Sequence, residues 1–410
     1  MIDVDSASFL LITVAATLAA LTVAVLPRRI VPPVVALEVL LGIVIGPQVL
    51  DLAQNDDFTE FFGNLGLGML FFFAGYELDF DRLRGRPLVL AGAGWLISLA
   101  LAYSIGGALA AAGIVLSLLY TGSAMATTAI GTLIPILRDA GDLRTRFGTY
   151  LLGAGGAGEF GPILLVTLFL STSHPLHEAA FLIGFTALAA VLAIASVRGV
   201  GRGWWEVLER SMEASSQAAI RVLVMLVFGL VALASTLGLD LLLGGFAAGI
   251  VTRMALHGRE VEVLESKLTA VGYGFLIPFF FVTSGMAFDL DSLLSSAGAL
   301  LKVPMFLALF LVVRGTPALL LYRGVLAARQ RAALAFFSAT ELPLVVAITS
   351  IATDAGHMRA STAAALVGAA ILSTLIYPFV GLALRRRDRD DAEAGELDTV
   401  PAGAEAASAS

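Results

Sequence analysis

Four ionisable residues lie inside long apolar runs of the sequence: Glu38, Glu159, Arg314 and Glu341. If such a run crosses a membrane, each charge costs about 2.5 kcal/mol or more, so a functional task is the default explanation. Glu159 stands in GAGGAGEFGP, whose glycines allow neighbouring backbones to approach closely. Away from water a carboxyl group favours its protonated form, and when ionised it attracts a cation. We expect Glu159 to bind H⁺ and an alkali cation in turn, which is the minimum machinery for exchanging the two.

Polar residues and proline interrupt two of the apolar runs in a similar way. One run reads TGSAMATTAIGTLIPIL and the other reads SATELPLVV; their polar side chains are Ser123, Thr127 and Thr128 in the first, and Ser338, Thr340 and Glu341 in the second. Proline removes a backbone donor, and backbone freed inside a membrane is tolerated only beside protein or water. We expect both helices to break near mid-membrane and to cross, presenting hydroxyls, carbonyls and half-helix ends to a small ion. The simpler alternative is that these hydroxyls bond back to their own helices.

The other three ionisable residues have less specific roles. Arg314 stays protonated, so we expect a fixed counter-charge that pairs with Glu159 when no cation is bound; snorkelling toward the lipid surface is the alternative. Glu341 either caps amides freed at the break or balances a half-helix N-terminus, or it belongs to the ion site. Glu38 is matched by Asp240 in a similar sequence context, which favours an architectural or gating role.

The composition places these residues in a membrane protein. Of 410 residues, 58% are hydrophobic and only 14% are charged, against roughly a quarter in an average soluble protein. The net charge of −7 argues against a nucleic-acid partner. The absence of cysteine excludes disulfides and thiolate chemistry, and the predicted spans contain no Ser–His–acid or HExxH arrangement. GAGGAG follows no predicted strand, so we expect neither an enzyme nor a cofactor.

Apolar runs long enough to cross a bilayer recur thirteen times along the chain. A bilayer-crossing helix needs about 20 mostly apolar residues. By this measure the predicted spans cover residues 8–26, 31–49, 62–77, 88–112, 115–137, 147–171, 178–197, 219–236, 239–255, 268–286, 298–322, 332–353 and 361–384. The acidic start MIDVDS lacks the basic region of a cleaved signal peptide, so we expect the first run to be retained.

Basic residues alternate between the loops that join these spans. With the N-terminus outside, the cytoplasmic loops hold 22 of the 25 Lys and Arg residues, as the positive-inside rule requires. We therefore predict a multi-pass protein of a prokaryotic cytoplasmic (inner) membrane, with its C-terminus in the cytoplasm. The chain then divides into a first half with a linker helix (1–197), a cytoplasmic connection (198–217), a second half (218–385) and a disordered acidic tail (386–410).

Three short sequence matches, in the same order, predict an internal repeat. LEVLLG at 37–42 resembles LDLLLG at 239–244, and the phenylalanines at 71–73 are answered by those at 279–281. The third match joins the Asp-Ala-Gly triplets at 139–141 and 354–356. Each pair lies seven predicted spans apart, so its two copies run in opposite directions through the membrane. We predict an all-α fold of thirteen transmembrane helices in two inverted repeats with crossed broken helices, which is typical of transporters.

Four signatures resemble the sodium/hydrogen exchanger family, in the second branch of monovalent cation:proton antiporters. They are PPVVALEVLLGIVIGP, LFFFAGYELDF, GGFAAGIVTR and PFFFVTSGMAFDL, and the resemblance covers roughly residues 10–385. It implies a homodimer whose scaffold is formed by predicted spans 1–3 and 8–10. Spans 4–6 and 11–13 would form a core that carries the ion by an elevator-like movement. It also implies that Glu159 matches the essential core carboxylate, Thr127 and Thr128 the polar break, and Arg314 the core basic residue.

The sequence departs from this family in two places. The family usually has Asp at the position of Glu159, preceded by Asp, Asn or Gln, whereas Gly158 precedes it here. Electrogenic members use two acids, so a single carboxylate favours one-for-one, electroneutral exchange. The cytosolic nucleotide-binding domain of glutathione-gated potassium-efflux relatives is also missing from this sequence, so we expect any ligand gating to come from a separate regulatory subunit.

We therefore expect a secondary antiporter that exchanges Na⁺ or K⁺ for H⁺, with no preference between the two cations readable from the residues. Two alternatives remain open. A channel-like cation-efflux module gated by a separate subunit would conduct without proton coupling. An organic-anion symporter on a similar fold would need a larger pocket and a basic residue in it, which would leave Glu159 without a task.

Overall fold

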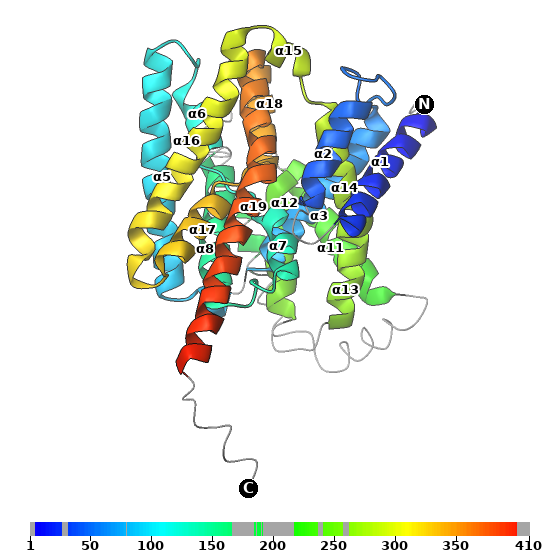
Figure 1. Cartoon of the computed structure of the whole chain (residues 1–410). Coiled ribbons are helices and arrows are strands. Elements are labelled where there is room, and N and C mark those ends of the chain that lie inside the picture. Colours follow the sequence, from blue (N-terminus) through cyan, green and yellow to red (C-terminus); the bar gives the residue numbers. More distant parts are fainter. Residues whose placement is uncertain are drawn as a thin grey trace.

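Helices make up the regular structure of the described residues, and no strand occurs among them. The computed structural model describes residues 5–26, 32–78, 80–165, 184–185, 187–189, 191, 217–236, 241–256 and 262–399 (Figure 1). The helices are α1 (Ser6–Val25), α2 (Val34–Ile45), α3 (Asp57–Tyr76), α4 (Phe80–Leu83), α5 (Arg86–Ala111), α6 (Leu118–Met125), α7 (Ile130–Asp139), α8 (Arg146–Leu165), α11 (Ala218–Thr236), α12 (Leu241–Ala255), α13 (Glu262–Val271), η2 (Gly272–Leu276), α14 (Ile277–Met286), α15 (Leu290–Leu294), α16 (Ala297–Leu321), η3 (Tyr322–Gly324), α17 (Ala328–Ser338), α18 (Pro343–Asp354) and α19 (Ala360–Thr399).

The predicted membrane character is confirmed, whereas the number of spans stays a prediction. Within the described ranges, eight helices are long and apolar enough to cross a membrane, and α2 and α12 are shorter apolar helices. The predicted span 178–197 and the connection 198–217 lie almost wholly outside the described residues, and so does Asp240. The helix α19 continues to Thr399, past residue 386, where we predict the disordered tail to begin.

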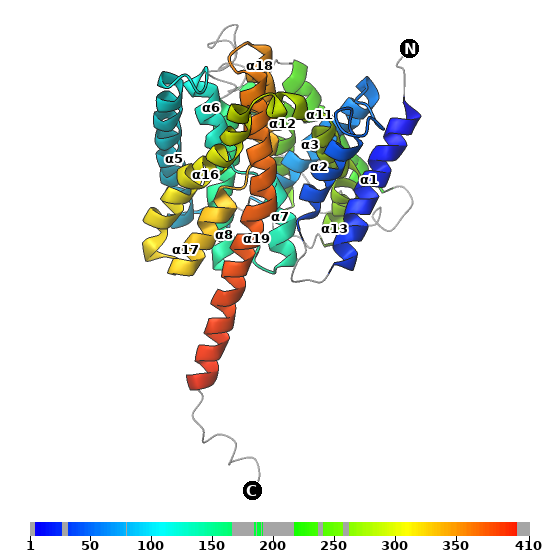
Figure 2. The ribbon, with the colours of Figure 1, turned by 45° about the horizontal axis from the view of Figure 1, so that its top comes forward.

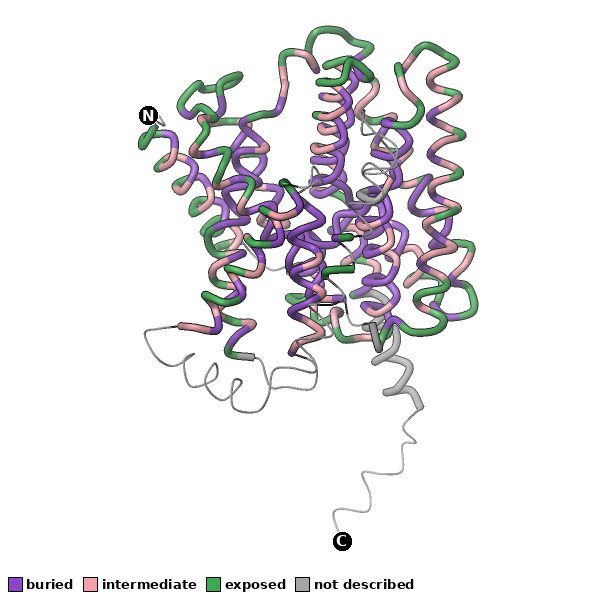
Figure 3. Tube along the Cα trace, turned by 180° about the vertical axis from the view of Figure 1, so that it is seen from behind, coloured by how far each residue is buried: buried purple, intermediate pink, exposed green. Residues whose placement is uncertain are grey.

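The helices pack in two bundles that stand side by side in Figures 1 and 2. We call α1, α2, α3, α11, α12, α13, η2 and α14 the scaffold bundle, and α5, α6, α8, α16, α17, α18 and α19 the core bundle. The short helix α7 contacts α3 of the scaffold bundle and α8 of the core bundle. Thus α7 lies at the boundary between the bundles. Viewed from behind, the buried positions gather where the helices face one another (Figure 3).

Glycines bring the scaffold helices into backbone contact. A Cβ atom at Gly42 of α2 would lie 2.1 Å from the carbonyl oxygen of Val282 in α14, and one at Gly249 of α12 would lie 2.1 Å from that of Phe72 in α3. Side chains other than hydrogen therefore do not fit at these positions, and small residues of this kind are what lets membrane helices pack closely. The predicted repeat would exchange these two contacts, because it relates α2 to α12 and α14 to α3.

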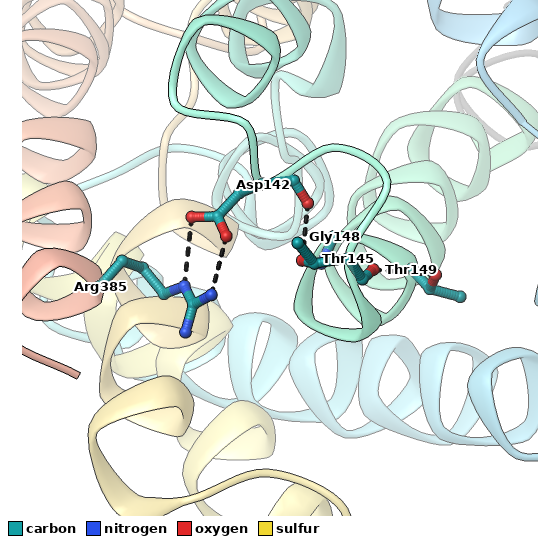
Figure 4. A network of polar contacts seen from close by, with 5 residues as sticks. All are labelled: Asp142, Thr145, Gly148, Thr149 and Arg385. Atoms are coloured by element: carbon teal, nitrogen blue, oxygen red, sulfur yellow. Dashed lines mark hydrogen bonds and ion pairs between the residues drawn. The ribbon is translucent and has the colours of Figure 1, made fainter. Parts of the chain in front are cut away.

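A buried ion pair ties the end of the core bundle together (Figure 4). The guanidinium of Arg385, in α19, donates to both carboxylate oxygens of Asp142, at 2.7 and 3.2 Å. Asp142 lies between α7 and α8, and the Arg385 side chain also covers the ring of Phe147 in α8, 4.4 Å from its centroid. This pair therefore fixes the end of α19 against the turn that carries the chain from α7 into α8.

Asp142→Asn should lower the free energy of unfolding by about 3–5 kcal/mol, because it takes a carboxylate from a buried arginine that cannot lose its own charge. Thermal unfolding of the purified protein in detergent measures this loss. Asp139→Asn, three residues earlier and exposed, is the matched control and should leave the melting temperature unchanged. Equal melting temperatures for the two variants would contradict the importance of the pair.

Candidate functional site

Both interrupted helices break where the sequence predicts. The first stops at Met125 and resumes at Ile130, so residues 126–129 join α6 to α7. The second stops at Ser338 and resumes at Pro343, so residues 339–342 join α17 to α18. Proline at the first turn of α18 suits a helix that starts anew, because its missing N–H has no intrahelical partner there. Each break leaves backbone groups that need partners from elsewhere.

The two breaks supply these partners to each other. The amide of Ala129 donates to the carbonyl oxygen of Thr340 at 2.8 Å. The hydroxyl of Thr128 donates to the carbonyl oxygen of Ser338 at 2.5 Å. Because each bond joins the α6–α7 break to the α17–α18 break, the two interrupted helices meet where their regular structure is lost.

Prolines free two further carbonyls close to this crossing. In a helix, proline leaves the carbonyl four residues earlier without its donor. Pro162 frees the carbonyl of Gly158 in α8, which accepts from the amide of Thr128 at 3.0 Å. Pro317 frees the carbonyl of Val313 in α16, which accepts from the hydroxyl of Ser98 in α5 at 2.9 Å. Both freed carbonyls are thus bound by a neighbouring element instead of by water.

Glu159 lies buried in α8 with 1% of its surface exposed. Neither carboxylate oxygen has a hydrogen-bond partner among the described residues. The backbone amides of Ile130 and Gly131, the first residues of α7, face this carboxylate. A helix N-terminus carries a partial positive charge and attracts anions. The carboxylate therefore lies where half a helix begins, with its oxygens open to a proton or a cation.

Arg314 is buried in α16, but it does not pair with Glu159 as expected. Its guanidinium donates to the Thr128 hydroxyl at 2.9 Å, the Ser98 hydroxyl at 3.2 Å and the Ala154 carbonyl at 2.9 Å. The expected ion pair is absent because neutral oxygens already hold the guanidinium on the other side of the crossing. Lipid snorkelling is excluded by the same contacts, since the side chain is only 4% exposed.

The glycine before Glu159 makes room for this guanidinium. A Cβ atom on Gly158 would lie 2.3 Å from Nη2 of Arg314 and 2.7 Å from the hydroxyl oxygen of Thr128. Both distances are shorter than Cβ contacts in proteins, so a side chain at 158 would require the ends of the Arg314 and Thr128 side chains to move. The arginine thus occupies the space beside Gly158.

Glu341 is the carboxylate that lies in the electrostatic field of Arg314. Its side chain is fully buried, and its carboxylate oxygens have no hydrogen-bond partner among the described residues, although the Thr127 side chain faces them. Its backbone is fixed separately, because Ser373 and Thr374 of α19 donate to its carbonyl oxygen at 3.0 and 3.2 Å. The position of Glu341 is therefore set by the contacts of its backbone with α19 and not by its charge.

Three buried polar atoms surround a small cavity behind Arg314. They are Nε1 of Trp95, the hydroxyl oxygen of Tyr322 and Oγ of Ser338, none of which has a hydrogen-bond partner among the described residues. The cavity offers about 10 Å³ to the centre of a water molecule, which is about the room that one water needs.

Two candidates from the sequence lie apart from the crossing. The hydroxyl of Ser123 lies one turn before the break, 3.1 Å from the hydroxyl of Tyr103 in α5. Glu38 is buried in α2, which packs against α1 and α14 of the scaffold bundle. Within the described residues, no hydrogen bond or ion pair joins Glu38 to Glu159 or Arg314, so Glu38 lies outside the site at the crossing.

Several residues that hold the site together were not predicted from the sequence. Ser98 binds Arg314, while Ser373 and Thr374 hold the backbone of Glu341. A lone hydroxyl in an otherwise apolar helix was the available signal, but such residues usually bond to their own helix. Which of them reaches across depends on helix orientation, which composition does not determine.

Comparisons with known proteins agree with this architecture. The sequence profile described as "Sodium/hydrogen exchanger, transmembrane" matches residues 14–382. The chain is 25% identical to "Putative Na(+)/H(+) antiporter YjbQ" of Bacillus subtilis over 380 residues, which is 88% of this chain but 60% of that protein. It is 27% identical to "Na(+)/H(+)-K(+) antiporter GerN" of Bacillus cereus over 278 residues, covering 65% of this chain and 68% of GerN.

A solved structure shares the fold. The sodium proton antiporter MjNhaP1 of Methanocaldococcus jannaschii superposes with a TM-score of 0.59 at 18% identity, covering 92% of this chain and 95% of that one. At this identity the likeness concerns the fold alone. The profile match extends over most of the chain and includes both breaks, Glu159 and Arg314. The chain therefore belongs to the sodium/hydrogen exchanger family of membrane proteins.

Proposed function

We propose that this protein exchanges Na⁺ or K⁺ for H⁺ across the cytoplasmic membrane, with Glu159 as the shared binding site. The observation that carries the proposal is the buried Glu159 carboxylate, which has no hydrogen-bond partner among the described residues and faces the amides that begin α7. A buried carboxylate without a partner is costly as an anion. It is stable when it holds a proton or when a cation lies against it, and only one of the two fits at a time.

The neighbouring oxygens suit an alkali cation. We propose that the Thr127 hydroxyl and the carbonyls released at the two breaks are the neutral ligands that replace the hydration shell of a cation. The Thr128 hydroxyl is held between Arg314 and the Ser338 carbonyl, and it would have to exchange these partners to join them. The α7 N-terminus stabilises the ionised form of Glu159 when the proton has left. Names of relatives such as GerN, a "Na(+)/H(+)-K(+) antiporter", support both cations as substrates.

Arg314 supports a one-for-one, electroneutral exchange. It is held by neutral oxygens from α5, the α6–α7 break and α8, and a guanidinium stays protonated. Its charge therefore does not change during the cycle. We propose that Glu341, the second buried carboxylate without a hydrogen-bond partner among the described residues, keeps one protonation state through the cycle. Glu159 alone then alternates between H⁺ and a cation, and one positive charge crosses in each direction.

The two bundles support alternating access by an elevator-like movement. The close glycine contacts of α2 with α14 and α3 with α12 make the scaffold bundle a compact unit. We propose that the scaffold bundle forms the interface of a homodimer and that the core bundle slides along it. Both carboxylates and Arg314 would then move together, because the helices that carry them belong to the core bundle.

Glu159→Gln should abolish cation-dependent proton movement, since an amide neither releases a proton nor binds a cation as a carboxylate does. In everted vesicles, NaCl or KCl should collapse a preformed proton gradient for the wild type and leave it intact for Glu159→Gln. Glu159→Asp should retain part of the activity. Glu60→Gln, which changes an exposed carboxylate in the first turn of α3, is the control and should keep the response. A full response of Glu159→Gln would overturn the proposal, and cation flux without proton movement would favour the channel-like alternative.

Initial transport rates should not depend on membrane potential if each cycle moves one charge each way. Purified protein in proteoliposomes, with a pH gradient and a set potential, provides the measurement. The expected rates agree within about twofold between 0 and −120 mV, whereas moving one net charge through this potential is worth about 2.8 kcal/mol. A rate that rises steeply with potential would contradict electroneutral exchange while leaving the role of Glu159 intact.

A further inference from the structure

The carbonyl of Gly131 lacks its helical donor. Gly131 is the second residue of α7, and the residue four positions later is Pro135, which has no N–H. An unsatisfied carbonyl inside a membrane protein is costly, so it needs a partner from another element. The carbonyls of Gly158 and Val313 also lack their helical donors, and they accept hydrogen bonds from the α6–α7 break and from α5, respectively.

The donor to Gly131 comes instead from the scaffold bundle. The Tyr273 hydroxyl donates to the carbonyl oxygen of Gly131 at 3.3 Å. Tyr273 lies in η2, a π-helical turn between α13 and α14, and its ring packs against that of Phe73 in α3 at 4.8 Å between centroids. Short π-helical turns often occur at functional sites, because they change the direction of a side chain within an otherwise regular helix.

Gly131 connects this scaffold contact with Glu159. Its amide faces the Glu159 carboxylate, while its carbonyl binds Tyr273. A second contact fixes the other end of α7, where Arg138 donates to the Glu77 carboxylate at 2.5 Å and approaches the Thr269 hydroxyl at 3.5 Å. Both partners belong to the scaffold side of the boundary, so α7 is held at two points along its length.

We propose that Tyr273 is a positioning residue of the ion site, supplied by the scaffold bundle. By holding the carbonyl that Pro135 frees, it fixes the residue whose amide faces Glu159. The inference rests on the proposed function and deepens it. The residues just before α7 bind the core bundle, since the amides of Thr128 and Ala129 donate to the carbonyls of Gly158 and Thr340. If the core bundle slides and carries α7 with it, the bond between Tyr273 and Gly131 breaks and the carbonyl must take another partner. Whether the Gly131 amide is held in place beside Glu159 then depends on the position of the core bundle relative to the scaffold bundle.

Tyr273→Phe tests this role because it removes only the hydroxyl. We expect the apparent KM for Na⁺ or K⁺ in everted vesicles to rise about three- to tenfold, the change that one hydrogen bond is worth, while the maximal rate stays within about twofold. The melting temperature of Tyr273→Phe should not fall below that of the control variant Tyr76→Phe. An unchanged KM, or a fall in maximal rate alone, would overturn the positioning role.

Tyr76→Phe is the matched control. Tyr76 also packs against a phenylalanine of α3, but its hydroxyl donates at 2.7 Å to Glu265, inside the scaffold bundle. It should keep the KM of the wild type. If Tyr273→Phe and Tyr76→Phe raise the KM equally, the effect belongs to scaffold packing in general and the proposal fails.

Pro135→Ala provides the second arm, because alanine at 135 restores the helical donor to the Gly131 carbonyl. In that background Tyr273→Phe should change the KM by less than about twofold; an undiminished effect would show that Tyr273 acts by another route. If Pro135→Ala does not fold, the KM of Tyr273→Phe alone decides. A normal KM for Tyr273→Phe beside an inactive Glu159→Gln would refute only this inference, whereas a fully active Glu159→Gln would refute the proposed function itself.

Discussion

The arrangement of the site depends on one constraint: a backbone carbonyl that loses its helical donor at membrane depth must find another. Prolines create this need at Gly131, Gly158 and Val313, and in each case a neighbouring element meets it. These bonds hold the broken helices, α5 and α8 in fixed relation. The same chemistry that would destabilise a lone helix thus locates the crossing at which Glu159 and Arg314 are placed.

The crossing holds two buried carboxylates without hydrogen-bond partners among the described residues, Glu159 and Glu341, and one buried arginine that neutral oxygens hold. Arg314 is bound by hydroxyl and carbonyl oxygens on one side of α8, whereas Glu159 projects toward the start of α7. This separation replaces the direct ion pair that the sequence suggests. It also gives the arginine a structural task, because it joins α5, α8, α16 and the α6–α7 break without needing a carboxylate.

Much of this could be predicted from sequence, since apolar length and proline position are local signals. The breaks after Met125 and Ser338 follow from the polar and proline residues in two apolar runs, and burial of Glu159 follows from its glycine-rich surroundings. The predicted pairing of Arg314 with Glu159 was wrong, because the partner of the guanidinium depends on which face of α16 meets α8. No residue pattern revealed Tyr273, whose contact depends on a π-helical turn in a helix that reads as uniformly apolar.

The missing side chain at Gly158 has an evolutionary consequence. A single-base change in a glycine codon can introduce aspartate, which would place a second acid beside Glu159. Here that substitution would bring its Cβ within 2.3 Å of a guanidinium nitrogen of Arg314, so the end of the arginine side chain would have to move. The volume at position 158 and the place of this buried positive charge are therefore coupled, and a substitution at either one is felt at the other.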